Sequence, residues 1–304
     1  MEQIYELLSK AIPKERIRVN EPMSEHTSFN IGGPADLFVT VMNEEELATV
    51  LRLACENNAH HLIIGNGSNF LVSDKGYRGI IVKLGDAFSD ISVEGNEITV
   101  GAGRLLSSTS AFACRSGLAG LEFASGIPGT IGGAIFMNAG AYGGEMKDVV
   151  RSARLMSPDG SQVTELSNDE LGLEYRHSII QETGDIVLSV VLGLESDDSE
   201  AISARIAELS ARRKAKQPVQ YPSAGSTFKR PVGGYAAALI ESAGLKGYAI
   251  GGAKVSEKHS GFIINTGGAT CKDVLDLMKY VQQKVFENSG IMLEPEVRII
   301  GELE

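Results

Sequence analysis

Ser226 has the sequence surroundings of a residue that takes part in chemistry. It lies in SAGSTFK (223–229), flanked by Gly225 and followed by Lys229. The segment lacks the GxSxG pattern of a hydrolase nucleophile, and no Asp and His are spaced to complete a triad. A hydroxyl beside cations can instead give a proton to a developing carbanion, so we interpret Ser226 as a candidate proton donor.

Two more charged residues lie in polar contexts. Glu296 belongs to LEPEVR near the C-terminus, where the alternation of an extended strand puts Glu294, Glu296 and Arg298 on one face. Three charged residues on one face indicate that this face is either exposed to solvent or part of a functional site. Arg176, in EYRHS (174–178), follows an aromatic residue in a polar stretch.

Nine glycines lie between Gly117 and Gly144, in a stretch that is neither low-complexity nor periodic. Glycine suits backbone that turns with positive φ or approaches another group closely, and its N–H groups can converge on an anion. The stretch predicts either backbone wrapped around a large, flat or phosphorylated ligand, or tight turns between short strands.

A second glycine segment, GNGSN (65–69), follows a predicted strand and could hold a pyrophosphate through its N–H groups. The dinucleotide fingerprint requires GxGxxG at the start of a helix, but Phe70 occupies the last position here. A second possible fingerprint begins at Gly101, but Leu106 occupies the position of its last glycine. A standard Rossmann site is therefore not expected, although GNGSN and the glycine stretch together favour a cofactor site.

Composition excludes several classes of protein. A length of 304 residues suggests two or three domains, and 43% hydrophobic and 22% charged residues are typical of a globular protein. No apolar run approaches the roughly 20 residues of a membrane span, and the N-terminus does not resemble a signal peptide. Three distant cysteines and five histidines show no disulfide framework or metal-ligand spacing. A net charge of −11 argues against nucleic acid as the main partner.

The charge is unevenly distributed, because the segment from Leu209 to Ile240 contains no Asp or Glu. Its cations are Arg212, Arg213, Lys214, Lys216, Lys229 and Arg230. The first four could simply complement the dipole at a helix C-terminus, but the last two are left unexplained. The segment therefore predicts an anionic ligand near it.

Periodicity predicts the elements that position these residues. Predicted helices cover 44–58, with Asn43 as cap, 105–116, a stretch from Ser199, 235–243, and a stretch that follows Thr270 and ends at Gly290. Predicted strands cover 61–64, 79–84, 91–94, 97–100, 149–157, 162–166, 186–194 and 291–301. The pattern indicates a mixed α/β region to about residue 196 and an α+β region after it.

Seven segments together resemble one enzyme family. In chain order they are EHTSFNIGGPAD (25–36), GNGSNFLVSD (65–74), GIPGTIGGAIFMNAGAYGGE (126–145), YRHS (175–178), AGSTFKRP (224–231), LKGYAIGGA (245–253) and LEPEVRIIG (293–301). No single segment is decisive, but seven in register are very specific. The chain closely resembles the UDP-N-acetylenolpyruvoylglucosamine reductase (MurB) family from about residue 20 to the C-terminus.

The resemblance implies an α+β protein with two parts. Residues 1–198 would form a two-lobed FAD-binding domain of the vanillyl-alcohol oxidase (PCMH) type with an N-terminal helix, and 199–304 a smaller α+β substrate domain. FAD would be bound non-covalently. The implied positions are Gly65, Asn66, Gly67, Ser68 and Asn69 at the pyrophosphate, and Gly126, Ile127, Pro128, Gly129, Gly132, Gly133, Asn138, Gly140 and Ala141 around the flavin.

The resemblance also implies an NADPH-dependent oxidoreductase of cytoplasmic peptidoglycan precursor synthesis. NADPH would reduce FAD, and UDP-N-acetylglucosamine enolpyruvate would then take a hydride at its terminal enolpyruvyl carbon. The adjacent carbon becomes an aci-carboxylate dianion, which needs electrostatic stabilisation and a proton. Arg176 and Glu296, the latter as a protonated carboxyl, align with the stabilising residues, and Ser226 aligns with the proton donor.

Five further residues align with positions that contact the substrate: Tyr175, Lys216, Lys229, Lys246 and His259. The resemblance implies no metal, nucleic acid, membrane or protein partner. Two other functions stay open beside the reductase. One is an oxidase of the same fold with another substrate, and the other is a non-catalytic sugar-nucleotide-binding protein, which the intact SAGSTFK and EPEVR segments disfavour.

The chain departs from one branch of the family. The segment between Arg176 and the helix after residue 199 is short, so the chain resembles the shorter, second branch, which lacks a loop whose tyrosine closes over the substrate. Arg230 stands where the first branch has an asparagine, and His259 where it has a glutamine.

Overall fold

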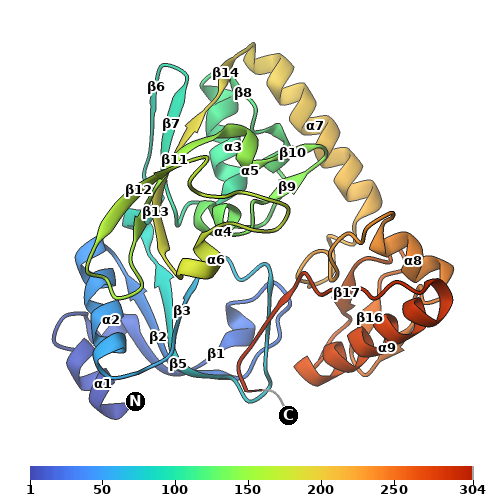
Figure 1. The fold of residues 1–304 in the computed structure, drawn as a ribbon, viewed down its shortest axis with the longest axis horizontal. Helices are drawn as coiled ribbons and strands as arrows, with labels where there is room; N and C mark the ends of the chain where they lie inside the picture. The colour runs from blue at the N-terminus through green and yellow to red at the C-terminus, as the bar shows by residue number, and fades with distance from the viewer. Residues whose placement is uncertain (303–304) are drawn as a thin grey trace. The chain divides into compact units, whose positions relative to one another are not determined.

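An antiparallel sheet with the strand order β12-β11-β13-β7-β6 forms the centre of the first unit (Figure 1). Its strands are β6 (Ile91–Glu94), β7 (Glu97–Gly101), β11 (Val150–Met156), β12 (Val163–Ser167) and β13 (Ile186–Gly193). The two predicted hairpins are confirmed: β6 pairs with β7 and β11 pairs with β12. Gly95 and Gly160 make the turns with φ of 58° and 73°, which suit glycine.

The computed structural model describes residues 1–302. Within them the chain forms two compact units, each assembled from separate segments. The first unit comprises Met1–Val19, Leu37–Asn66 and Gly79–Arg213, and the second comprises Asn20–Asp36, Gly67–Arg78 and the described residues from Lys214 on.

Short helices cover the five-stranded sheet. The helix α4 (Ile131–Phe136) packs against β13 and β7, as Figure 1 shows. The helix α3 (Leu106–Arg115) ends at the predicted glycine, since Gly117 has a φ of 67°. The core between sheet and helices is built from aliphatic side chains such as Val100, Leu106 and Ile135. Residues of the glycine stretch thus contribute to the main core of the first unit.

The N-terminal part of the first unit builds a second core. The helix α1 (Glu2–Leu8) contacts α2 (Glu44–Glu56), in which Asn43 accepts a hydrogen bond from the Glu46 N–H at 2.8 Å, as predicted. A four-stranded sheet has the order β1-β2-β5-β3. Its strands are β1 (Ile17–Pro22), β2 (Pro34–Val41), β3 (His61–Ile64) and β5 (Tyr77–Leu84).

The glycine stretch is not a chain of plain turns. It contains α4, the small strands β8 (Leu118–Ala119), β9 (Gly140–Ala141) and β10 (Gly144–Glu145), and loops between them. Two short helices follow, α5 (Met146–Val149) and α6 (Ile180–Thr183), and β8 pairs with β14 (Glu195–Ser196). Sequence periodicity did not predict α4, because Gly132 and Gly133 lie inside it and glycine is a poor helix former.

The helix α7 (Ser199–Lys216) starts as predicted, but its cap differs. Asp198, and not Ser199, accepts hydrogen bonds from the N–H groups of Glu200 and Ala201, at 3.1 and 3.0 Å. Of the expected apolar stripe only Ile202 is fully buried. Arg205 instead attaches the helix to the rest of the first unit, because its guanidinium forms ion pairs with Glu122 and Asp197.

The compact units do not follow the predicted boundary at residue 198. Most of α7 belongs to the first unit, and the segments 20–36 and 67–78 join the C-terminal residues. The reason is a non-local pairing, because β4 (Phe70–Val72) pairs in parallel with β18 (Arg298–Ile300). The division into a flavin-binding part (1–198) and a substrate-binding part (199–304) stays a prediction.

The second unit has its own core. The helix α9 (Cys271–Ser289) packs against α8 (Ala236–Ser242) and against the strands β15 (Ala249–Ile250) and β16 (Ala253–Val255). The strand β17 (Ile263–Asn265) pairs with β16. The predicted stripe of α9 is buried, namely Val274, Leu277, Met278, Val281 and Val285. Phe29, Ile31 and Leu71 complete this core from the N-terminal half of the chain.

One predicted strand is largely wrong. The expected strand over 291–301 is reduced to β18, preceded by an isolated bridge between Phe228 and Pro295. Leu293 and Val297 are buried as the alternation predicted, but Pro295 is exposed. Proline has no N–H to donate to a ladder, so a regular strand is interrupted there.

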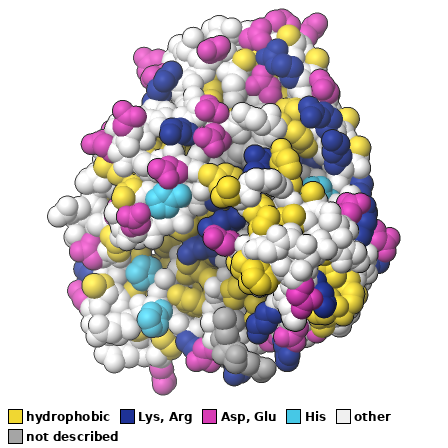
Figure 2. All heavy atoms as spheres, turned by 45° about the vertical axis from the view of Figure 1, so that its right-hand side comes forward, with side chains coloured by type: hydrophobic (Ala, Val, Ile, Leu, Met, Phe, Trp, Pro, Cys, Tyr) yellow, Lys and Arg dark blue, Asp and Glu magenta, His cyan; other side chains and the backbone are white. Residues whose placement is uncertain are grey.

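Surface and membrane properties complete the description. On the face drawn in Figure 2, acidic and basic side chains are interspersed and are not gathered by sign. No helix within residues 1–302 combines the length and the apolar character that a membrane span requires.

The N-terminus of α9 yields a first prediction. Asp74, from the segment GNGSNFLVSD, accepts hydrogen bonds from the N–H groups of Cys271 and Lys272 at 2.8 and 3.0 Å, which adds to the capping box of Thr270 and Asp273. We expect Asp74→Ala to lower the free energy of unfolding by about 1 kcal/mol, because the cap is lost. Chemical denaturation measures this. Asp276→Ala, which removes an exposed ion pair with Lys272, should cost about 0.5 kcal/mol or less; equal losses would contradict the role of Asp74.

Candidate active site

The backbone of the second unit places Ser226 beside Glu296. The neighbouring Thr227 carbonyl accepts a hydrogen bond from the Glu296 N–H at 2.8 Å, and the Lys229 N–H donates to the Glu294 carbonyl at 2.8 Å. On its other side, Thr227 donates through its N–H to the Gly261 carbonyl at 2.9 Å and accepts from the Ile263 N–H at 3.0 Å through its hydroxyl. The segment that carries Ser226 is therefore held between the C-terminal segment and the strand β17.

Gly225 gives this segment its direction. Its φ is 77°, in the left-handed region, and an added Cβ would meet no atom within 4 Å. The requirement for glycine is therefore conformational and not steric. Ser223, just before it, is fixed by two hydrogen bonds with Ser28: the Ser28 hydroxyl donates to the Ser223 carbonyl at 2.7 Å, and the Ser223 N–H donates to the Ser28 carbonyl at 3.1 Å.

Asn69, the last residue of GNGSN, also contacts the Glu296 segment. Its side-chain amide donates to the Glu296 carbonyl at 3.2 Å, and its own carbonyl accepts from the Arg298 N–H at 2.9 Å. Three segments far apart in sequence thus meet within the second unit. We predicted Asn69 as a pyrophosphate contact; the contacts described here are instead with the protein backbone.

The basic residues expected to bind substrate differ in their partners. The Lys229 ammonium lies 3.6 Å from the Glu294 carboxylate, and the Lys246 ammonium lies 3.0 Å from that of Glu241. Both pairs are well exposed, so each is weak and easily exchanged for another anion. Lys216 is exposed at the C-terminal end of α7, and no ion pair of it occurs among residues 1–302.

His259 is half-buried beside the Ser226 segment. Its Nδ1 accepts a hydrogen bond from the Gly261 N–H at 3.2 Å, and its ring meets Phe262 edge to face at 5.0 Å between centroids. Burial lowers the pKa of His259, and the Lys246 ammonium acts in the same direction, against the Glu241 carboxylate. The imidazole therefore favours its neutral form.

In the first unit, GNGSN begins against the glycine stretch. The Asn66 side-chain amide donates to the Pro128 carbonyl at 3.0 Å. A Cβ on Gly65 would lie 2.3 Å from the Thr130 hydroxyl oxygen, so only glycine allows this approach. Thr130 caps α4, and its hydroxyl accepts from the Gly133 N–H at 3.4 Å. Thr130 was not among the predicted site residues.

Other predicted flavin positions have structural tasks that the sequence did not reveal. The N–H of Gly132 donates to the Ala102 carbonyl at 2.8 Å. Asn138 is fully buried with a φ of 41°; its side chain donates to the Glu174 carbonyl at 3.0 Å and accepts from the Lys147 N–H at 2.9 Å. Gly140 and Ala141 form β9. Asn138 thereby anchors the segment that carries Arg176.

Arg176 belongs to the first unit, whereas Ser226 and Glu296 belong to the second. Its φ of 56° is in the left-handed region, which is uncommon outside glycine and is typical of functional loops. Its carbonyl accepts from the Gln181 side-chain amide at 3.1 Å, and its guanidinium lies 5.1 Å from the ring centroid of the exposed Tyr175. Within the second unit, the structure brings the segments of Ser226 and Glu296 together.

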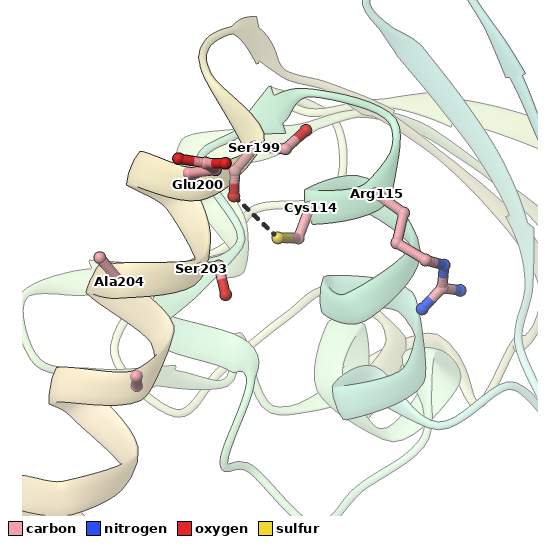
Figure 3. A pocket seen from close by; sticks show the side chains of 7 residues that line it. Cys114, Arg115, Ser199, Glu200, Ser203 and Ala204 are labelled. Carbon is pink, nitrogen blue, oxygen red and sulfur yellow. Dashed lines mark hydrogen bonds between the residues drawn. The ribbon is translucent and has the colours of Figure 1, made fainter.

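A shallow depression of about 540 Å³ lies between the end of α3 and the first turns of α7 (Figure 3). Cys114, Ser199 and Ser203 line it, and the Cys114 thiol donates weakly to the Ser199 carbonyl at 3.6 Å. None of the predicted site residues lines it. We therefore place no part of the active site there.

Comparisons with known proteins identify the family. The sequence model of the UDP-N-acetylenolpyruvoylglucosamine reductase C-terminal domain matches residues 217–300, and that of an FAD binding domain matches residues 35–165. The UDP-N-acetylenolpyruvoylglucosamine reductase of Alkaliphilus oremlandii is 51% identical over 298 residues, which are 98% of each chain. This chain belongs to the UDP-N-acetylenolpyruvoylglucosamine reductase family.

Solved structures agree with this assignment. UDP-N-acetylenolpyruvylglucosamine reductase (MurB) from Thermus caldophilus matches with a TM-score of 0.81 at 38% identity, over 93% of this chain and 99% of that chain. Alkyldihydroxyacetonephosphate synthase matches with a TM-score of 0.50 at 15% identity, over 64% of this chain and 41% of that chain, and shares the fold alone. The predicted family, the fold class and FAD as cofactor are confirmed.

The residues of the first unit fit such a cofactor. Within the described part of the chain, the N–H groups of Gly126, Gly129 and Thr130 donate no hydrogen bond. They lie in the segment that Gly65 and Asn66 approach. Free backbone N–H groups in such a loop are suited to an anionic group such as a phosphate.

The close approach of Gly65 to Thr130 yields a second prediction. We expect Gly65→Ala to weaken FAD binding roughly tenfold or more, because the new methyl group forces Thr130 away from its position. Titration of apoprotein with FAD, followed by flavin fluorescence, measures the affinity. Thr130→Ala in the same chain removes the clashing oxygen and should restore part of the loss.

Gly234→Ala is a suitable control, since an added Cβ there meets nothing within 4 Å. It should bind FAD as the wild type does. Unchanged FAD affinity in Gly65→Ala would show that the contact is not part of the cofactor site.

Proposed function

We propose that this chain reduces the enolpyruvyl group of UDP-N-acetylglucosamine enolpyruvate to the lactyl ether of UDP-N-acetylmuramate, with NADPH as the electron donor. The observation that carries the proposal is the contact between the Ser226 and Glu296 segments in a chain related to these reductases over 98% of its length. The reaction is a step of peptidoglycan precursor synthesis, which we place in the cytoplasm.

The net reaction adds a hydride and a proton across a carbon–carbon double bond. When bound, FAD supplies hydride transfer between NADPH and the terminal enolpyruvyl carbon. The electron pair of the double bond is then left on the carbon that carries the ether oxygen and the carboxylate. The protein must stabilise this charge and deliver one proton to that carbon.

Ser226 is the proposed proton donor. The backbone on both sides of it is fixed, by Ser28 before it and by the Gly261 carbonyl after it. Ser226 is partly exposed, and the space beside Gly225 is open, since an added Cβ there would meet no atom within 4 Å. A hydroxyl on such a fixed segment can give up its proton as negative charge develops opposite it.

Glu296 and Arg176 are the proposed stabilising residues. A guanidinium offers several donors to a carboxylate in a fixed geometry. Glu296 acts as a protonated carboxyl that donates a hydrogen bond to the developing dianion. Such donors act most strongly when their positions are set before the reaction, and Thr227 and Asn69 set the position of the Glu296 backbone.

Five residues are proposed to hold the rest of the substrate: Tyr175, Lys216, Lys229, Lys246 and His259. The exposed pairs of Lys229 with Glu294 and of Lys246 with Glu241 can open at little cost when a diphosphate or a carboxylate arrives. A neutral His259 offers one N–H donor without adding charge.

The role of Ser226 can be tested by separating the two halves of the reaction. In Ser226→Ala, NADPH should bleach the bound flavin at the wild-type rate, because no proton of Ser226 is needed there. Oxidation of the reduced enzyme by the enolpyruvyl substrate should be slowed by roughly a hundredfold or more. Stopped-flow absorbance under anaerobic conditions follows both steps.

Ser242→Ala, at an exposed position of α8, should behave as wild type in both steps. Equal slowing of both half-reactions in Ser226→Ala would refute a proton-donor role. Failure of the wild-type protein to respond to the enolpyruvyl substrate, together with rapid oxidation by oxygen, would refute the reductase itself.

Replacement of Glu296 distinguishes a donor from a negative charge. Glu296→Gln keeps a hydrogen-bond donor, so we expect it to retain more activity than Glu296→Ala, in which roughly a hundred- to a thousandfold of rate should be lost. The measurement is kcat for the substrate half-reaction in both variants. A glutamine variant as slow as the alanine variant would indicate that the carboxyl group acts in another way.

A further inference from the structure

Arg213, near the C-terminal end of α7, lies on the glycine stretch of the first unit. A Cβ on Gly126 would be 2.9 Å from the Arg213 Cδ and 3.2 Å from its Nη1. The guanidinium therefore rests against the Gly126 backbone itself. Any side chain at residue 126 would displace it.

This arginine is shielded but has no counter-charge. It is partly buried, and among residues 1–302 it forms no ion pair with a carboxylate. Burial lowers the pKa of Arg213, and the Tyr142 phenol acts weakly in the opposite direction. Shielding a guanidinium from water without a carboxylate partner costs free energy, unless an anion occupies the place.

Its neighbour Arg212 shows the contrast. Arg212 is exposed, lies 3.9 Å from the Glu208 carboxylate one turn earlier, and stacks 5.3 Å from the ring centroid of Tyr142. Such a residue requires no ligand to explain it. The two adjacent arginines of α7 thus have different surroundings, and of the two only Arg213 has no carboxylate partner.

Several backbone N–H groups of the loop that Arg213 contacts also have no hydrogen-bond acceptor. The N–H groups of Gly126, Gly129 and Thr130 donate no hydrogen bond within the described residues. A guanidinium and several free N–H groups on one loop form a site for an anion with several oxygens, of which a phosphate is the usual example.

We propose that Arg213 binds the diphosphate of FAD. The inference rests on the assignment of FAD as cofactor, since Gly126 lies in the range matched by the FAD binding domain model. FAD is a resident group, so its diphosphate can neutralise a permanently shielded cation. The planar guanidinium fork suits phosphate oxygens better than an ammonium does.

The test is a flavin titration of apoprotein with three ligands, namely FAD, FMN and riboflavin, followed by flavin fluorescence. Arg213→Met keeps the apolar stem over Gly126 but removes the charge, and Arg213→Lys keeps the charge without the fork. We expect Arg213→Met to weaken FAD binding by roughly ten- to a hundredfold, with riboflavin binding unchanged and Arg213→Lys intermediate. Arg212→Met is the matched control and should bind FAD as the wild type does.

Thermal unfolding of the apoproteins separates binding from structure. Because Arg213→Met removes an uncompensated charge, its apoprotein should unfold no lower than the wild type, and the stabilisation by added FAD should be smaller. An apoprotein of Arg213→Met that unfolds several degrees lower would overturn the proposal in favour of a structural role.

Four further results would overturn it. Unchanged FAD affinity in Arg213→Met would exclude the contact. Equally weakened binding of FAD and of riboflavin would place the arginine at the flavin ring. Weaker binding of UDP with unchanged binding of FAD would assign the arginine to the substrate diphosphate. A wild-type apoprotein that binds no FAD would refute the cofactor assignment itself, and this inference with it.

Discussion

The parallel pairing of β4 with β18 is the interaction on which the candidate site depends. It joins residues 70–72 to residues 298–300, and the hydrogen bonds of Asn69 with Arg298 and Glu296 strengthen it at the N-terminal end of both strands. Glu296 is thereby fixed next to Thr227, whose neighbour is Ser226. Asp74, two residues after the end of β4, caps α9 and so links the same segment to the core helix of this unit. Without this pairing, the two residues proposed for charge stabilisation and proton transfer would have no common framework.

Steric limits on glycine play the corresponding part in the first unit. Gly65 has to be glycine because of the Thr130 hydroxyl, and at Gly126 the missing side chain leaves the space that the Arg213 side chain occupies. In both places the missing side chain lets polar groups come close to bare backbone, where N–H groups are free to bind an anion. The glycine stretch is thus explained in part by close approach between protein groups, and its role around a ligand stays a prediction.

Much of the local structure could be predicted from the sequence, because local signals determine it. The caps at Asn43 and Thr270 and the hairpin at Gly95 follow from residues within a few positions of each other. The helix α4 could not be predicted, since its start depends on Thr130 and its glycines oppose helix formation. The composition of the second unit was also missed, because Phe29, Ile31 and Leu71 join its core through contacts more than 150 residues away in sequence.

The site shows the same division between local and non-local information. The candidate residues could be named from motifs, because the resemblance to the family fixes residue types in order. What Asn69 and Asn138 contact could not be deduced, since both amides bind backbone carbonyls of distant segments. The cations make the physical point most clearly. Lys229 and Lys246 keep exposed carboxylate partners that a substrate can replace at each turnover, whereas Arg213 is shielded and has none. A weak exchangeable pair suits a ligand that leaves, and a partly buried charge without a carboxylate partner suits a ligand that stays.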